Sequence, residues 1–202
     1  MDSIIRYVTN MLPYMLCSLP VILIVRYIRI KTMKKRGLKT TGLHEVGVVL
    51  FAVFLVGLAS QTIIPKIEFG NTTQFIVGSG TGEINLIPFK VIKETYTAVF
   101  TDGYIEYFLI NFVGNVVMFM PIGFCVPLLW RKMRFKQVVV TGALASLLIE
   151  VCQLPQARGT DIDDVWINTV GCMLGFAIFL AFKKLFPDIT EKFKALYAAK
   201  DE

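Results

Sequence analysis

Five long apolar segments constrain the fold of this chain more than any other feature of its sequence. A transmembrane helix needs about 17–25 mostly apolar residues, and five segments reach or approach that length: 11–28, 46–64, 107–130, 138–154 and 165–182. The 202-residue chain is 55% hydrophobic and only 18% charged, whereas a soluble domain carries about 25% charged residues. We therefore predict an all-α integral membrane protein, a five-span helical bundle that forms a single membrane domain over residues 1–202.

The basic residues predict which side of the membrane each connection faces. Most of the 21 lysine and arginine residues lie between the first two predicted spans, between the third and fourth, or after the fifth. Connections with this excess of positive charge face the cytoplasm. We therefore expect the N-terminus outside the cell and the C-terminus in the cytoplasm. The same alternation accounts for the net charge of +6 without a nucleic-acid partner.

The connection between the second and third predicted spans is long, and we expect it on the outer side. Residues 67–82 place glycines around a short apolar run, which predicts turns or a short hairpin. Residues 85–89 read Asn-Leu-Ile-Pro-Phe, and apolar side chains then recur at helical spacing as far as Phe100. We expect this part to form an amphipathic segment that lies along the membrane surface. A connection of this length is usually functional.

Polar side chains from four separate parts of the chain are predicted to meet at the outer side of the membrane. Glu150 and Gln153 are three residues apart, so they share a face of the fourth span. Asp161, Asp164 and Asn168 form one stripe of the fifth helix if that helix begins near Asp161. Ionisable groups within a span are costly and usually functional. The candidate binding residues are Asn85, Asn111, Asn115, Glu150, Gln153, Arg158, Asp161, Asp164 and Asn168, with Asp163 in the same segment.

This set of side chains permits one structural and two functional uses. In the structural use the amides bridge helices, and Asp161 or Asp163 caps the fifth helix. In the first functional use the acids supply oxygen ligands to a divalent cation, which holds a lipid phosphate. In the second, Arg158 binds an anionic group while the acids hold its guanidinium in place. The acids match no recognised metal loop, and the only histidine, His44, lies in a predicted cytoplasmic connection. The sequence therefore assigns no catalytic residue, metal or cofactor.

The polar and small-residue motifs occur in an order that is also found in a known protein family. The set consists of Asn85-Leu-Ile-Pro-Phe, Asn111-x-x-x-Asn115-x-x-x-Phe119-x-Pro121-x-Gly123, Glu150-x-x-Gln153, Arg158, Asp161-x-x-Asp164-x-x-x-Asn168 and Gly171-x-x-x-Gly175. In this order it resembles the VanZ family of bacterial membrane proteins, over about residues 85–179.

The resemblance implies a function at the bacterial cell membrane. Members are associated with low-level resistance to glycopeptide antibiotics, teicoplanin above all, without alteration of the peptidoglycan precursor. A protein of this kind would engage a lipoglycopeptide antibiotic, a membrane lipid or a lipid-linked cell-wall precursor at the outer leaflet. The alternatives are a scaffold role and a membrane enzyme that modifies a lipid-borne phosphate or acyl group with Glu150, Arg158, Asp161 and Asp164. We favour binding because the sequence shows no pair of nucleophile and base.

Overall fold

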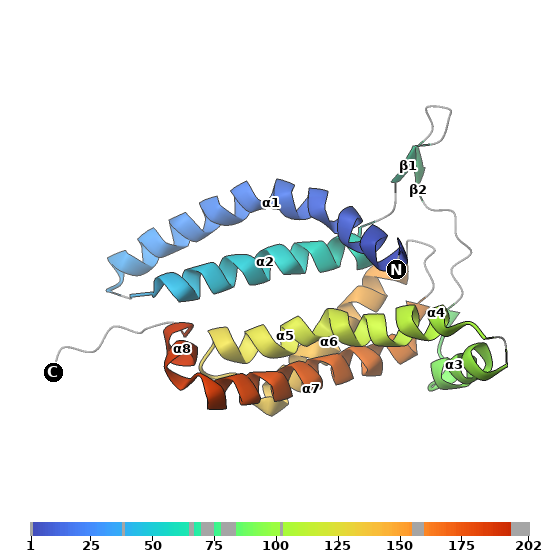
Figure 1. The fold of residues 1–202 in the computed structure, drawn as a ribbon. Coiled ribbons are helices and arrows are strands. Elements are labelled where there is room, and N and C mark those ends of the chain that lie inside the picture. The colour runs from blue at the N-terminus through green and yellow to red at the C-terminus, as the bar shows by residue number, and fades with distance from the viewer. Residues whose placement is uncertain are drawn as a thin grey trace. The chain divides into compact units, whose positions relative to one another are not determined.

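The chain folds into helices, five of which are long and apolar enough to cross a membrane (Figure 1). A computed structural model describes residues 2–37, 39–64, 67–69, 75–77, 84–101, 103–154 and 160–194. The five spans are formed by α1 (Asp2–Lys35), α2 (Gly42–Thr62), η1 with α5 (Leu109–Gly114 and Asn115–Leu129), α6 (Phe135–Gln153) and α7 (Ile162–Leu185). The predictions of an all-α membrane fold and of five spans are confirmed.

Helix α1 is longer than the apolar segment that predicted it. We expected its span to end near Ile28, but the helix continues to Lys35. Lysine and arginine are good helix formers, and Lys34 and Lys35 in the last turn favour the negative end of the helix dipole. Much of the first basic stretch is therefore helical.

The third span begins with an irregular turn that the sequence did not predict. Leu109–Gly114 form a π-helix, η1, directly before α5. Such turns are rare, and many occur at functional sites. Asn111 lies within η1, and Asn115 is the first residue of α5. The side-chain amide of Asn115 donates a 3.0 Å hydrogen bond from Nδ2 to the carbonyl oxygen of Asn111.

The long connection contains short strands and helices. Strands β1 (Ile67–Phe69) and β2 (Phe75–Val77) pair antiparallel, which confirms the predicted hairpin. The predicted amphipathic segment is helical and forms α3 (Lys90–Phe100), and α4 (Ile105–Phe108) follows it. Strands β3 (Ile84–Asn85) and β4 (Thr160–Asp161) pair in parallel, with Asn85 opposite Asp161. This pairing, which the sequence did not predict, brings the connection to the start of α7.

The chain divides into two compact units. Unit 1 comprises Met1–Gln61, Phe124–Arg134 and Ala177–Glu202, and unit 2 comprises Thr62–Gly123 and Phe135–Phe176. In unit 1 the segment around α8 (Pro187–Lys192) packs against the start of α2. His44 Nδ1 lies 2.8 Å from the carbonyl oxygen of Phe193, and the Thr41 hydroxyl donates to the carbonyl of Lys192. These polar contacts hold the segment that follows α7 against the start of α2.

In unit 2, small residues allow α5, α6 and α7 to approach one another closely. A Cβ added at Gly123 would overlap the backbone carbonyl of Cys172 in α7. A Cβ added at Gly142 in α6 would lie 2.6 Å from the sulfur of Cys172. At Gly171 it would overlap the backbone carbonyl of Val116. Because helices in lipid associate mainly through close packing, these contacts hold in place the three helices that carry most of the polar residues.

Candidate binding site

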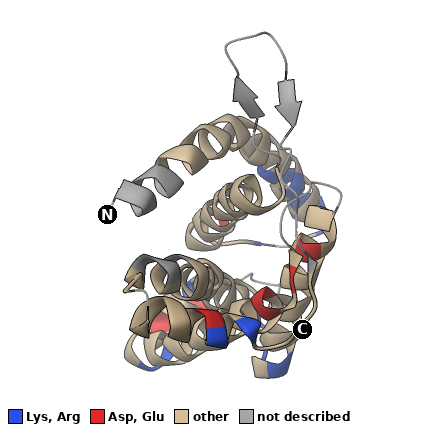
Figure 2. Cartoon of the chain, turned by 90° about the vertical axis from the view of Figure 1, so that its right-hand side faces the viewer, with Lys and Arg blue, Asp and Glu red and all other residues tan. Residues whose placement is uncertain are grey.

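The predicted polar residues meet at one end of unit 2, where α5 and α7 begin and α6 ends. Figure 2 views the molecule from the side where α7 begins, and acidic residues, in red, are visible there. The convergence predicted from the sequence is therefore present for Asn85, Asn115, Glu150, Asp161 and Asp164. Their hydrogen bonds form two groups, one around Asp161 and one around Asp164.

The first group connects α6, β4 and β3 through Asp161. Glu150, which is only 5% exposed, accepts the backbone N–H of Asp161 at Oε2, with a distance of 3.0 Å. Asp161 Oδ1 accepts two hydrogen bonds, from Asn85 Nδ2 at 2.8 Å and from the backbone N–H of Asp163 at 2.9 Å. The bond to the second residue of α7 is the one that an N-cap residue makes.

The expectation that Asp161 shares a helical stripe with Asp164 and Asn168 is wrong. Helix α7 begins at Ile162, one residue too late, and Asp161 belongs to β4. Its backbone pairs with Asn85 and its side chain caps the helix, which keeps it outside the helix. Asp164 and Asn168 alone lie one turn apart on α7.

The second group connects α5, α6 and α7 through Asp164 and Asn168. Asn115 Nδ2 donates to Asp164 Oδ1 at 2.8 Å. Asn168 Nδ2 donates to the hydroxyl oxygen of Ser146 at 2.8 Å, and that hydroxyl donates to the backbone carbonyl of Asp164 at 3.3 Å. Ser146 is fully buried and was absent from the predicted set. Its position one turn before Glu150 on α6 is the sequence signal that would have identified it.

Two buried polar atoms of this region have no hydrogen-bond partner in the part of the chain that the structure describes. They are Oδ1 of Asn168, whose residue is 4% exposed, and the hydroxyl oxygen of Thr160, which precedes Asp161. An unsatisfied buried polar group costs about 1–3 kcal/mol, and in a native protein it is often explained by water or a ligand. The Asn168 oxygen is therefore an acceptor for a buried water or for an N–H or O–H group of a ligand that reaches this position.

Asp163 has a structural role, which separates it from the other acids. Its fully buried carboxylate accepts three hydrogen bonds: from the backbone N–H of Phe89 at 2.5 Å, from that of Val91 at 2.8 Å and from Trp166 Nε1 at 2.8 Å. Phe89 and Val91 belong to the first turn of α3, whose N–H groups need acceptors. Asp163 therefore caps α3 across 72–74 residues of sequence.

The remaining predicted residues occupy other places. Gln153 Nε2 donates to the carbonyl oxygen of Thr62, the last residue of α2, at 3.0 Å. Asn111 contributes its carbonyl to the bond with Asn115. Arg158 lies outside the described residues. Within the described ranges, no three His, Cys, Asp or Glu side chains are placed to hold a metal ion.

Comparison with protein families identifies the chain. The family model described as VanZ/LLP1 matches residues 47–183. The chain belongs to the VanZ family. The match covers more than half of the chain and includes every candidate binding residue from Asn85 to Asn168, so the resemblance seen in the motifs is confirmed. No curated protein and no solved structure matches the chain. With its five apolar helices, this VanZ family member is a multi-pass membrane protein.

Proposed function

We propose that this VanZ family member binds a ligand at the polar end of unit 2 and thereby confers low-level resistance to teicoplanin-type glycopeptides. The ligand is the lipoglycopeptide antibiotic, a membrane lipid or a lipid-linked cell-wall precursor. One observation carries the proposal: Asn168 Oδ1 is a buried acceptor without a partner in the described chain, and it lies one turn from Asp164. A purely structural set of amides would be expected to satisfy its own acceptors.

The contacts of the acids favour binding over catalysis. Asp161 caps α7 and Asp163 caps α3, so both carboxylates already hold backbone N–H groups. The Ser146 hydroxyl donates to a backbone carbonyl, not to a carboxylate that would act as its base. Of the four acids described at this end of unit 2, Asp161 and Asp163 cap helices, and Glu150 and Asp164 do not. An enzyme acting on a lipid-borne phosphate or acyl group would depend on these two, together with Arg158.

The proposed site faces the outside of the cell, because the basic connections alternate with acidic ones along the chain. Single cysteines at Lys35 and at Gly80, in a variant without the four native cysteines, test this orientation. An impermeant maleimide applied to intact cells should label the cysteine at position 80 and leave that at position 35 unlabelled. Labelling at position 35 would place the site on the cytoplasmic side and exclude direct contact with an extracellular antibiotic.

The function is tested with two substitutions that preserve side-chain volume, Glu150→Gln and Asp164→Asn. Each keeps an oxygen that can accept the observed hydrogen bond from Asp161 or Asn115. Hydrogen bonds between membrane helices contribute only about 0.6 kcal/mol on average, so both variants should remain folded. Teicoplanin susceptibility is measured in cells with equal amounts of each variant, beside thermal melting in detergent. We expect folded protein that has lost resistance.

The control is Asp188→Asn, which changes an exposed acid of α8 in unit 1 and should leave resistance intact. If Glu150→Gln and Asp164→Asn lose resistance only in proportion to a loss of folded protein, the polar residues form a scaffold. Mass spectrometry of lipid that co-purifies with the intact protein and with Arg158→Ala then identifies the class of ligand. A co-purified lipid that is chemically altered by the intact protein, and unaltered by Glu150→Gln, would establish the enzyme instead.

A further inference from the structure

Helix α3 has three faces with different surroundings, although it lies outside all five spans. One face packs on protein: Val91 is only 5% exposed and forms a buried cluster with Val116 of α5 and Ile167 of α7. A second face is polar and exposed, and carries Lys93 and Thr97. Successive residues of a helix are about 100° apart, so these faces take up roughly two thirds of the circumference.

The third face is apolar and uncovered. It consists of Phe89, Ile92, Tyr96 and Phe100, which we call the α3 stripe, and all four side chains are more than half exposed, Phe100 reaching 75%. Ile92, Tyr96 and Phe100 follow one another at intervals of four residues, which aligns them along one side of the helix. The row of exposed side chains does not serve the protein core, because Val91 is the residue through which α3 packs into that core.

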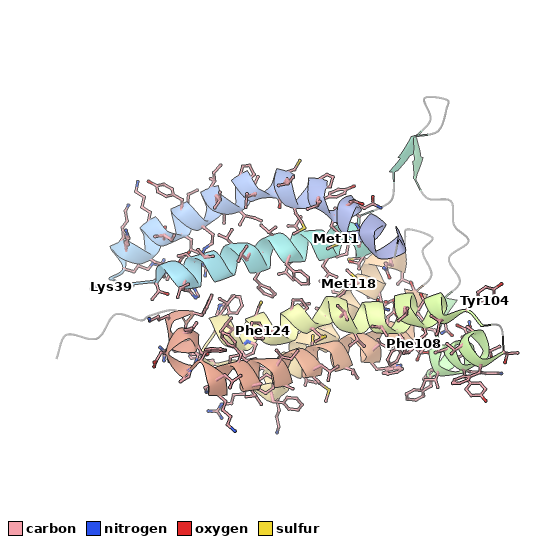
Figure 3. All side chains as sticks on the ribbon, in the orientation of Figure 1. Met11, Lys39, Tyr104, Phe108, Met118 and Phe124 are labelled. Carbon is pink, nitrogen blue, oxygen red and sulfur yellow. The ribbon has the colours of Figure 1, made fainter. Side chains whose placement is uncertain are left out.

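Other exposed apolar side chains lie in the residues just before and just after α3. They are Leu86, Ile87, Tyr104 and Ile105. Tyr104 points away from the helices at the end of unit 2 (Figure 3). A group of exposed large apolar side chains favours a surface that contacts a membrane or a protein.

The position of α3 along the spans decides between these partners. Asp163, in the first turn of α7, holds the N-terminus of α3, and the ring centroids of Phe89 and Trp166 are 5.8 Å apart. Val91 packs against Val116, the second residue of α5, and against Ile167, in the second turn of α7. Helix α3 is therefore held beside the start of the α7 span, and the start of a span is the level at which tyrosine and tryptophan meet lipid headgroups.

The backbone at the start of α3 is arranged to present Phe89. This residue has φ of 64°, a left-handed conformation that is unusual for a bulky side chain. Its N–H donates to Asp163 Oδ1, and its ring remains 61% exposed beside Trp166. A strained residue persists only where its surroundings hold it, and here a buried carboxylate holds it.

We propose that the α3 stripe inserts into the interfacial layer of the phospholipid bilayer. Val91 then fixes the helix to the protein, and Lys93 and Thr97 face the water and headgroups. This arrangement is that of an interfacial amphipathic helix, with its apolar side in the acyl boundary and its polar side above it. It goes beyond the proposed binding function, because it concerns a separate surface and is independent of any antibiotic.

Spin labels at single cysteines test the proposal in the full chain, reconstituted in vesicles of phosphatidylcholine. Cys17, Cys125 and Cys152 are replaced, and Cys172 is retained because it is fully buried. Labels are placed at Tyr96 and Phe100 on the stripe, and at Thr97 on the polar face as the matched control. A label at Leu144, an exposed position within the α6 span, provides the reference for lipid contact.

The measured quantity is the ratio of label collisions with oxygen, which concentrates in lipid, to collisions with a water-soluble nickel chelate. We expect this ratio at Tyr96 and Phe100 to be several-fold higher than at Thr97 and to approach that at Leu144. Equal ratios at Tyr96, Phe100 and Thr97 would place the stripe in water and overturn the proposal. Protection of both stripe labels from both reagents would also overturn it, because protein would then cover the stripe. In that case, spin–spin broadening that disappears on dilution with unlabelled chain would identify a second copy as the cover.

Discussion

Substitution of Asp163 tests how the structure positions α3. Asp163→Ala removes the acceptor of three N–H groups, those of Phe89, Val91 and the Trp166 indole. Loss of a helix cap costs about 0.5–2 kcal/mol, and a buried indole N–H without an acceptor costs about 1–3 kcal/mol. Removal of the buried carboxylate offsets part of this loss of stability, because a buried charge is itself unfavourable. We expect the free energy of unfolding to fall by about 2–4 kcal/mol.

Asp163→Asn provides a graded comparison. The amide retains one acceptor oxygen and nearly the same volume, but its NH2 group faces at least one of the N–H donors. We therefore expect about half the loss, near 1–2 kcal/mol. Asp188→Ala is the control, because Asp188 lies exposed in the first turn of α8, where a carboxylate contributes about 0.3–1 kcal/mol through the helix dipole.

The assay is reversible unfolding by SDS titration in mixed micelles, monitored by far-ultraviolet circular dichroism. If Asp163→Ala loses no more stability than Asp188→Ala, the carboxylate does not carry the three hydrogen bonds, and the reasoning about α3 is refuted. If Asp163→Asn loses as much as Asp163→Ala, the charge matters more than the number of acceptors.

The remaining predictions concern helix packing and pH. Gly123→Ala should destabilise unit 2 by about 3 kcal/mol or more, because its Cβ would overlap the Cys172 backbone. Gly42→Ala is the control: Gly42 has open space around it, and its substitution should change stability by less than about 1 kcal/mol. SDS titration of both variants measures the difference. The hydrogen bond from Lys194 Nζ holds the pKa of Glu191 below its ordinary value of 4.5. Glu191 therefore stabilises the folded chain above pH 4.5, and that contribution is lost as the pH falls through its lowered pKa. The stability advantage of the native chain over Glu191→Gln should accordingly disappear in acid, as measured by melting at a series of pH values; an advantage that persists or grows in acid would contradict this.

Local patterns were sufficient to predict the five spans and α3, but not the short elements η1, α4 and α8. Each span is a continuous apolar run, and α3 shows its spacing within eleven residues. The boundaries that differed depend on weaker local effects. Helix α1 continues through basic residues because these are good helix formers, and α7 begins after Asp161 because that residue is held in a strand.

The candidate site was predictable in its location but not in its division of roles. The sequence placed four acids within fifteen residues and offered Asp161 or Asp163 as a cap of the fifth helix, but it kept Asp161 among the binding residues. The structure shows that Asp161 and Asp163 cap two different helices, and that Asp163 does so for a helix more than 70 residues away. No local pattern records such a partner. The Asn168 oxygen, which has no partner among the described residues, was equally hard to predict, because its state depends on Ser146 accepting the amide N–H.

The parallel pairing of β3 with β4 has a consequence for the order in which the protein is completed. It joins Asn85 to Asp161, so the chain between them, including α5 and α6, must already be in place when the pair forms. Contacts between residues so distant in sequence form late, because closing a long loop reduces the entropy of the chain. When α6 has just been synthesised, α3 still lacks its cap, Asp163, and Asn115 still lacks its acceptor, Asp164. The candidate binding site is complete only when β4 and α7 have been synthesised, because a shorter chain has Asn115, Ser146 and Glu150 without their partners.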